Sequence, residues 1–276
     1  MRLRFDLRAK LVRNSRKRRW RSRGERAVPL RWFTGRPNFG DDANPHLFQL
    51  LGGNVGIRLA GKSEPHFLGM GSILRQAGPR SVVLGSGFIS ARDRLSLPRY
   101  RRIVAVRGQK TLRDLSLPEG DALLGDPMVL IDLLLERPSG RNSEIGLVPH
   151  ESNMRQYGKR YSGRFRVIDP RKEPMEVVEE IARCGAVISQ SLHGLIVADA
   201  MEVPNVWLEP DGMVGGKYKF EDYFTTVSGN TDCLAIADLD GGDPPEAAYD
   251  VRRFRFDKRD LLSALREAVL AGVDGP

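Results

Sequence analysis

The chain has 276 residues, of which 41% are hydrophobic and 29% are charged, and its formal net charge is +9. This length and composition suit two globular domains of moderate size and exclude an intrinsically disordered chain. No stretch approaches the roughly 20 consecutive apolar residues of a membrane-spanning helix. The basic N-terminus also lacks the apolar stretch of a secretion signal, so we expect a cytoplasmic protein.

The positive charge is concentrated at the N-terminus. Residues 1–27 contain twelve Lys or Arg and two acidic residues, whereas the rest of the chain has 32 basic and 33 acidic residues and is close to neutral. Two interpretations of this basic arm stay open: a solvated extension, or a peripheral contact with the anionic inner face of a membrane. Binding to nucleic acid comes third and is not expected. Apolar residues among the cations favour the membrane contact, namely Leu3, Phe5, Leu7, Leu11 and Trp20.

From Pro29 onward, short apolar runs alternate with helical patterns, which is typical of βαβ units and a largely parallel sheet. Strands are predicted at residues 30–33, 66–70, 81–84, 102–106 and 122–124. Helices are predicted at residues 45–51, 109–115 and 128–135, the first after the cap-forming Asp41, Asp42 and Asn44. The polar, breaker-rich segment 137–142 is predicted to be a linker, so a first domain spans residues 28–137.

A second alternation follows the linker, and we assign residues 143–240 to a second α/β domain. Strands are predicted at residues 145–149, 166–168, 186–188 and 205–208, and helices at residues 175–184 and 192–201. Segment 240–247 is predicted to be a loop and segment 258–271 a helix, so residues 241–276 form a C-terminal loop and helix. Ligands of open α/β sheets bind at the carboxyl ends of the strands, and we expect the functional residues in the loops there.

The segment Ser189-Gln190-Ser191-Leu192-His193-Gly194 joins a predicted strand to a predicted helix. It places two hydroxyls, an imidazole and unpaired backbone N–H groups at a helix N-terminus, where the partial positive charge favours a phosphate or carboxylate. His193 can donate to an anion or shuttle a proton near neutral pH. The alternative is that Ser191 only caps the helix and His193 fills a hydrogen bond in the core. The flanking serines, Gly194 and the strand-end position favour the functional interpretation.

Other strand ends supply further candidates, each with a structural alternative. The backbone of Gly85-Ser86-Gly87 could approach a ligand closely or form a plain tight turn. Arg107 could bind a carboxylate or phosphate in two-pronged fashion or form a surface ion pair. Asn38 and Asp41 could bind hydroxyls or cap a helix.

Three more polar residues are candidates. Lys217 and Lys219 follow the paired glycines at 215 and 216 and would add positive charge to a cleft, while the aromatic residues around them could simply pack in a short helix. His150 follows Val148-Pro149 at another predicted strand end. The two cysteines, Cys184 and Cys233, form no CxxC motif, and no cluster of histidines accompanies them. We therefore expect neither a disulfide framework nor a metal site.

In their order along the chain, these motifs resemble the polysaccharide pyruvyl transferase family, and within it the bacterial exopolysaccharide ketal-pyruvate transferases. The resemblance spans about residues 30–230 and leaves out the basic arm and the tail. The matching segments are Asn38-Phe39-Gly40-Asp41, Gly85-Ser86-Gly87, Val106-Arg107-Gly108, Gly125-Asp126-Pro127, Val148-Pro149-His150, Ser191-Leu192-His193-Gly194, Ala198-Asp199-Ala200, Val203-Pro204, Lys219-Phe220 and Asp222-Tyr223.

The resemblance implies two Rossmann-like domains in a glycosyltransferase-B-like arrangement. It also implies phosphoenolpyruvate as the donor substrate, no separate cofactor, and a pyruvate ketal on a sugar of an exopolysaccharide or of its lipid-linked precursor. His193 and Arg107 would be catalytic. The substrate-binding residues would be Asn38, Asp41, Gly85, Ser86, Gly87, His150, Ser189, Ser191, Lys217 and Lys219.

Two other functions stay open. A nucleotide-sugar glycosyltransferase would have a similar architecture, and a fold does not fix a function. A non-catalytic carbohydrate- or membrane-binding relative could also retain the fold. The product released from the donor, phosphate or a nucleoside diphosphate, separates the two enzymes, and a binding protein would tolerate the loss of His193 and Arg107.

Overall fold

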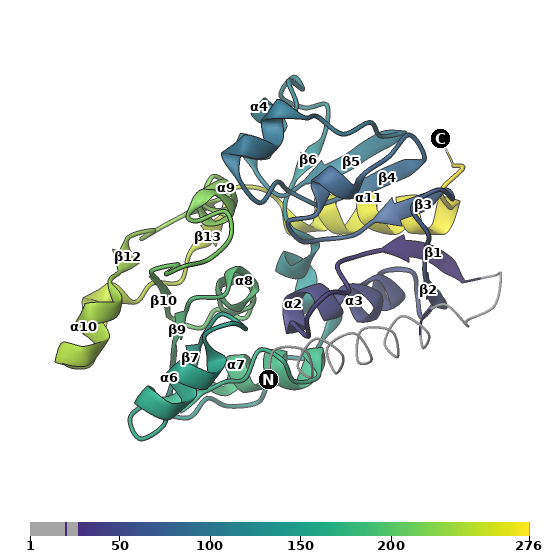
Figure 1. Cartoon of the computed structure of the whole chain (residues 1–276). Coiled ribbons are helices and arrows are strands. Elements are labelled where there is room, and N and C mark those ends of the chain that lie inside the picture. The colour runs from purple at the N-terminus through teal and green to yellow at the C-terminus, as the bar shows by residue number, and fades with distance from the viewer. Residues whose placement is uncertain (1–19, 21–26, 276) are drawn as a thin grey trace, which may run out of the picture.

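The computed structural model describes Trp20 and residues 27–275, which form two parallel β-sheets (Figure 1). The first sheet has six strands in the order β2-β1-β3-β4-β5-β6, and the second has five in the order β12-β10-β9-β7-β8. All pairings within these two sheets are parallel. The predicted α/β class with two Rossmann-like domains is therefore confirmed.

The first sheet is built from residues before the linker. Strand β4 (Ser81–Leu84) is buried along its whole length, because a parallel sheet is covered by helices on both faces. The other strands are β1 (Val28–Arg31), β2 (Ile57–Leu59), β3 (His66–Leu68), β5 (Arg102–Val106) and β6 (Leu123–Leu124). The helices of this half are α2 (Phe39–Asp42), α3 (Asn44–Leu51), η1 (Leu74–Gln76), η2 (Ala91–Leu95), α4 (Gln109–Asp114), η3 (Pro127–Leu130) and α5 (Ile131–Leu134).

Helix α8 (Leu192–Ala200) packs against the second sheet and against the segment η3 of the first half. All nine residues of α8 are buried, as is typical of a helix in which most residues are apolar. The strands of this half are β7 (Ile145–Val148), β8 (Arg166–Val167), β9 (Ala186–Ser189), β10 (Asn205–Leu208) and β12 (Cys233–Leu234). Its other helices are α6 (Met154–Tyr161), α7 (Pro174–Arg183), α9 (Tyr218–Phe224), α10 (Ile236–Gly241) and η4 (Glu246–Ala248).

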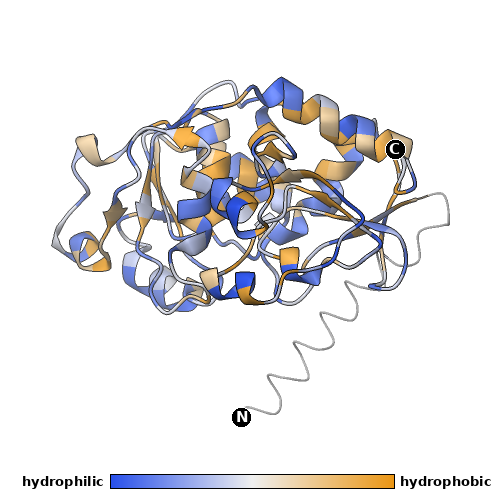
Figure 2. Ribbon diagram, turned by 90° about the horizontal axis from the view of Figure 1, so that it is seen from above, coloured by the Kyte–Doolittle hydropathy of each residue, from blue (hydrophilic) through white to orange (hydrophobic). Residues whose placement is uncertain are grey.

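After the second sheet the chain returns to the first. Strands β11 (Val227–Ser228) and β13 (Arg253–Phe254) pair antiparallel, and helix α11 (Lys258–Ala271) then lies against α3 and β5 (Figure 1). Helix α11 alternates between hydrophilic and hydrophobic residues beside the C-terminus in Figure 2, and its buried face contributes Leu261 and Leu265 to the core. The sequence pattern predicts this helix correctly but does not indicate that it covers the first sheet.

Several short elements are not predicted from the sequence. Strands of two or three residues such as β2 and β12 show no measurable alternation, and helix α2 is only four residues long. The predicted loop 240–247 begins inside α10 and ends inside η4. These elements are too short for a periodic pattern to reveal them.

The basic arm predicted at residues 1–27 lies outside the described residues, except for Trp20 and Ala27. The Trp20 ring contacts the rings of Trp32 and His46 edge-on, with centroids 5.9 Å away in both cases. Trp20 thus packs against residues that follow β1, and the contact of the basic arm with a membrane stays a prediction.

Candidate functional site

A cavity of about 260 Å³ lies where the carboxyl ends of the two sheets face each other. Its wall comes from the segments that follow β1, β3 and β4 of the first sheet and β7, β9 and β10 of the second. This is the position in which open α/β sheets bind ligands. The cavity brings together six of the residues predicted for the site, namely Asn38, Asp41, His150, Ser191, His193 and Lys219.

The turn before helix α8 is fixed by hydrogen bonds within the motif. The Ser191 N–H donates to Ser189 Oγ at 3.1 Å, and Ser189 Oγ donates to the Ser191 carbonyl at 2.8 Å. Ser191 Oγ then accepts from the Gly194 N–H at 3.4 Å and caps the helix. Ser189 therefore holds the turn from inside the protein, while Ser191 and His193 reach the cavity wall.

The His193 imidazole lies between the two halves of the protein, and the side chain is 10% exposed. Its Nε2 lies 3.6 Å from Oδ2 of Asp126, which is fully buried in the first half. Among the described residues neither of these two atoms has a hydrogen-bond partner. The other oxygen of Asp126 accepts from the Met128 N–H at 3.0 Å and so fixes the carboxyl group. The ring is therefore oriented with Nε2 toward Asp126 and Nδ1 toward helix α2.

Helix α2 lies directly against the same imidazole. A Cβ on Gly40 would overlap Nδ1 of His193, so only a glycine fits there in this arrangement. Asn38 Oδ1 accepts from the Gly40 N–H at 3.1 Å and caps α2. The interpretation of Asn38 as a helix cap is thus correct, and the residue also lines the cavity.

Lys219 brings an ammonium group to the cavity from helix α9. Burial is the main cause that lowers its pKa to about 8, and the nearby Arg107 cation adds to this. The Asp41 carboxylate opposes the shift. A lysine with such a pKa can both bind an anion and give up a proton near neutral pH.

His150 is a second titratable residue of the cavity wall whose pKa is lowered. Its backbone N–H donates to Gln190 Oε1 at 3.1 Å, and its Nδ1 lies 2.7 Å from Ser152 Oγ. Burial, together with the cations of Lys219 and Arg36, lowers the pKa of His150 to about 4. His150 is therefore neutral at neutral pH and can form hydrogen bonds without adding charge to the cavity.

Charges of both signs line the cavity. Arg36 of the first half forms an ion pair with Glu151 of the second half at 3.1 Å. The Lys219 ammonium group and the Asp41 carboxylate, which both line the cavity, attract each other electrostatically. The N-terminus of α8 adds the backbone N–H groups that an anion requires. An anion in the cavity would meet Lys219, Arg36 and the first turn of α8.

The structure does not bring Arg107 to the cavity. Its side chain is fully buried, and Nε and Nη2 each lie 2.9 Å from Oδ2 of Asp222. Nη2 also donates to the Phe88 carbonyl at 2.6 Å, and Nη1 donates to Ser72 Oγ at 2.8 Å. The interpretation as a surface ion pair is wrong, because the pair with Asp222 is fully buried, and binding of a ligand by Arg107 stays a prediction. The hydrogen bond from Nη1 connects the guanidinium to the cavity wall, because Ser72 lines that wall.

Besides Arg107 and Ser189, four predicted residues lie outside the cavity lining. Gly85 has φ +95°, which a glycine adopts without strain, and Ser86 Oγ donates to the Gly69 carbonyl. Gly87 lies against the Arg107 guanidinium. Lys217 is exposed, with its Nζ 5.6 Å from the centre of the Trp207 ring. These residues shape the neighbourhood of the cavity without lining it.

Sequence reasoning missed residues that the structure places in or beside the site. Asp126 sits in a segment already noticed at a strand end, but only the fold puts it opposite His193. Gln190 lies inside the main motif. Its Oε1 accepts hydrogen bonds from the His150 N–H and from Asn153 Nδ2, and its Nε2 donates to the Glu209 carbonyl. The cavity-lining residues that were not predicted include Arg36, Ser72, Gln76 and Glu151.

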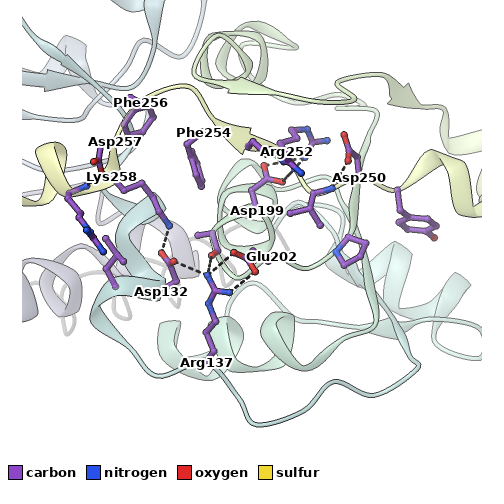
Figure 3. A pocket seen from close by; sticks show the side chains of 17 residues that line it. Asp132, Arg137, Asp199, Glu202, Asp250, Arg252, Phe254, Phe256, Asp257 and Lys258 are labelled. Carbon is purple, nitrogen blue, oxygen red and sulfur yellow. Dashed lines mark hydrogen bonds and ion pairs between the residues drawn. The ribbon is translucent and has the colours of Figure 1, made fainter.

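A larger cavity of about 960 Å³ lies at the other end of α8 (Figure 3). Several of its charged residues form ion pairs with one another: Asp132 pairs with both Arg137 and Lys258, and Arg252 pairs with Asp199. None of the residues predicted for the site lines this cavity. Size alone does not make it the functional site, and we place the function at the smaller cavity.

Within residue 20 and residues 27–275, no three His, Cys, Asp or Glu side chains are grouped so that they could hold a metal ion. No helix in that part of the chain has the length and apolar character needed to cross a membrane.

Comparison with known proteins adds family information to this geometry. The model of the family described as polysaccharide pyruvyl transferase matches residues 6–212. The match thus begins within the basic arm, which the motifs did not include, and ends before Lys217 and Lys219.

Among curated proteins, the chain is 28% identical over 208 residues to the succinoglycan biosynthesis protein ExoV of Rhizobium meliloti (strain 1021). This alignment covers 72% of this chain and 64% of that protein. It is 25% identical over 174 residues to an uncharacterized protein of Acanthamoeba polyphaga mimivirus. That alignment covers 59% of this chain and 60% of the viral protein. The chain thus spans less than two thirds of the length of either relative. A solved structure of a protein from Klebsiella pneumoniae has 13% identity and a TM-score of 0.48, and covers 85% of this chain and 98% of that one.

Proposed function

The chain belongs to the polysaccharide pyruvyl transferase family, and we propose that it transfers pyruvate from phosphoenolpyruvate to two hydroxyls of a saccharide, with release of phosphate. The product is a pyruvate ketal. The printed name of the relative from Rhizobium meliloti concerns the biosynthesis of an exopolysaccharide. This supports a sugar of an exopolysaccharide, or of its lipid-linked precursor, as the acceptor.

The observation that carries the proposal is the meeting of the α8 N-terminus with Lys219 in one cavity. Phosphoenolpyruvate has a carboxylate and a phosphate, so its site must supply several donors to anions. The first turn of α8, Lys219 and Arg36 supply them from both halves of the protein. Neutral His150 and Asn38 add hydrogen-bonding groups on the same wall.

The reaction requires that one proton is delivered to the donor and that one proton is removed from each of the two acceptor hydroxyls. A proton adds to the methylene carbon C3, and a sugar hydroxyl forms a bond to C2 as it loses its proton. The bond from C2 to the phosphate oxygen then breaks, and a second hydroxyl bonds to C2. One hydroxyl proton replaces the proton delivered to C3, and the other leaves with the phosphate, so the protein ends in its starting state.

The geometry suggests how the proton transfers are divided. Lys219, with a pKa of about 8, gives its proton to C3. His193 accepts a hydroxyl proton at Nδ1 while the Asp126 carboxylate stabilises the resulting imidazolium at Nε2. Asp41 and Asn38 line the side of the first domain and bind the acceptor hydroxyls. Arg107 supports the donor side indirectly, through its hydrogen bond to Ser72.

The function is tested by following the products. Purified protein is incubated with phosphoenolpyruvate and a saccharide acceptor, phosphate release is measured, and the new ketal methyl group is sought by proton NMR. A parallel reaction contains nucleotide sugars and is assayed for nucleoside diphosphate. Release of nucleoside diphosphate with transfer of a sugar would make the chain a glycosyltransferase and would overturn the proposal.

The pH dependence of the reaction should report Lys219. Only the protonated amine can donate to C3, so kcat/KM is expected to fall as the pH rises through about 8, the lowered pKa of Lys219. Lys219→Arg keeps the positive charge to a much higher pH but is a poor proton donor, and it should be slow without the alkaline fall. Lys110→Arg is the matched control on the first domain and should leave the profile unchanged. An alkaline fall that persists in Lys219→Arg would assign it to another group.

Gly40→Ala should lower activity by displacing the imidazole. The new Cβ would overlap Nδ1 of His193, so the ring has to move away from Asp126 or α2 has to shift. We expect a loss of about 100-fold in kcat/KM, because small misplacements of a catalytic group have effects of this size. Gly140→Ala is the matched control, since a Cβ there meets nothing within 4 Å. Equal activity of the two variants would show that the imidazole position does not matter.

A further inference from the structure

The loop that contains η2 presents apolar side chains to solvent. Leu95 is 82% exposed and Leu97 is 48% exposed, although both are large hydrophobic residues. Single exposed leucines are common on protein surfaces, but two of them two residues apart in one short segment form a local apolar projection. This projection needs an explanation beyond the core of the protein.

The same loop surrounds these leucines with unpaired positive charge. Arg92, Arg94 and Arg99 are exposed, and no ion pair or side-chain hydrogen bond engages them within the described residues. The one acidic residue of the loop, Asp93, is buried. Its Oδ2 accepts from the N–H groups of Ile89 and Ser90 at 2.9 and 3.2 Å. The carboxylate therefore faces inward while the cations face solvent.

A second loop, from the other half of the protein, lies beside this one. Gly215 has φ +82° and approaches the Ile89 carbonyl so closely that a Cβ on it would overlap that oxygen. The neighbouring Val214 is 75% exposed. Ile89 also lines the smaller cavity. The loop that carries the two leucines therefore meets the loop that carries Val214 at Ile89, a residue of the cavity wall.

From this arrangement we propose that Leu95 and Leu97, with Arg92, Arg94 and Arg99, dock the protein on the surface of an anionic lipid bilayer. The leucines enter the boundary between headgroups and acyl chains, and the arginines bind the lipid phosphates around them. Because Ile89 belongs to both the loop and the cavity wall, docking would hold the cavity close to the membrane surface.

The composition of this loop favours a bilayer over a protein partner. Cations around a small aliphatic projection match a surface that is uniformly negative outside and apolar beneath. A protein interface is expected to be centred on aromatic residues and to be depleted of free charges at its core. The proposal does not rest on the transfer reaction, since vesicle binding is measured without substrate.

The full-length protein is tested by sedimentation with vesicles made of equal parts phosphatidylcholine and phosphatidylglycerol. Leu95→Ser combined with Leu97→Ser is expected to lower the partition coefficient by about tenfold. Each of Arg92→Gln, Arg94→Gln and Arg99→Gln should lower it by about fivefold at low salt, and by less at high salt. Vesicles of phosphatidylcholine alone should bind the wild-type protein weakly.

Matched controls remove similar groups from other faces. Leu270, 63% exposed on α11, is changed to Ser, and Arg259, exposed at the start of that helix, is changed to Gln. Both controls should bind vesicles as the wild type does. Wild-type binding that survives the double leucine substitution would assign vesicle binding to the basic arm and overturn the proposal. A change in particle mass by light scattering without vesicles would also overturn it, because a second copy of the chain would then cover the leucines.

Discussion

Replacing His193 with glutamine is expected to lower kcat/KM for pyruvate transfer by about 100- to 10,000-fold, the usual contribution of a general acid or base. The imidazole lines the cavity, and its Nε2 lies 3.6 Å from a fully buried carboxylate of Asp126. Glutamine can replace the hydrogen-bonding capacity of the ring but cannot accept a proton from a sugar hydroxyl. Phosphate release from phosphoenolpyruvate, followed with a saccharide acceptor, measures the effect.

The matched control for this substitution is His46→Gln. His46 lies on α3 against the ring of Trp20 and does not line the cavity. We expect it to retain full activity, and both variants should keep the circular dichroism spectrum of the wild type. A His193→Gln protein that turns over as fast as His46→Gln would show that His193 is structural, as the alternative of a hydrogen bond in the core requires.

The fold could be predicted from the sequence because its main elements are long and apolar. Strand β9 and helix α8 follow each other as two apolar runs joined by a polar turn, and this local pattern determines both elements. The docking of α11 on the first sheet could not be predicted in the same way. Amphipathic periodicity shows which face of a helix is buried but does not say which partner buries it.

The candidate site could be predicted in part for a related reason. Residues at the ends of parallel strands meet at one edge of a sheet, so Asn38, His150 and His193 could be assigned to one cleft from their places in the chain. The pairing of His193 with Asp126 joins two domains and depends on their relative placement. No pattern along the chain encodes that placement.

The partner of Arg107 could not be predicted from the sequence. An arginine at a strand end is equally suited to bind a ligand or to form an ion pair, because both use the same planar set of donors. The sequence could not show that Asp222, 115 residues further along the chain, would be its partner. The short helix α9 carries both Asp222 and Lys219, so one element supplies the buried partner of Arg107 and the cation of the cavity.

Arg107→Met is expected to lower the free energy of unfolding by about 3–5 kcal/mol, because it leaves the buried Asp222 carboxylate without its cation. Thr111 still donates to that carboxylate from its N–H and its hydroxyl, at 2.9 and 2.7 Å, but provides no charge. Arg107→Met combined with Asp222→Leu should cost much less than the sum of the two single changes, since no buried charge remains. Urea unfolding measures these differences, and Arg183→Met, which breaks an exposed pair with Glu179, should cost at most about 1 kcal/mol.

The kinetics of the same variants decide between a positioning role and direct binding of the donor. If Arg107 acts through Asp222 and Ser72, then Arg107→Met and Asp222→Asn should change kcat/KM for phosphoenolpyruvate by similar factors, because each breaks the same link between β5 and α9. If the guanidinium instead swings into the cavity to hold the donor, only the Arg107 change should raise KM strongly. Asp222→Asn would then leave KM near the wild-type value, because a guanidinium released from its partner could still bind the anion.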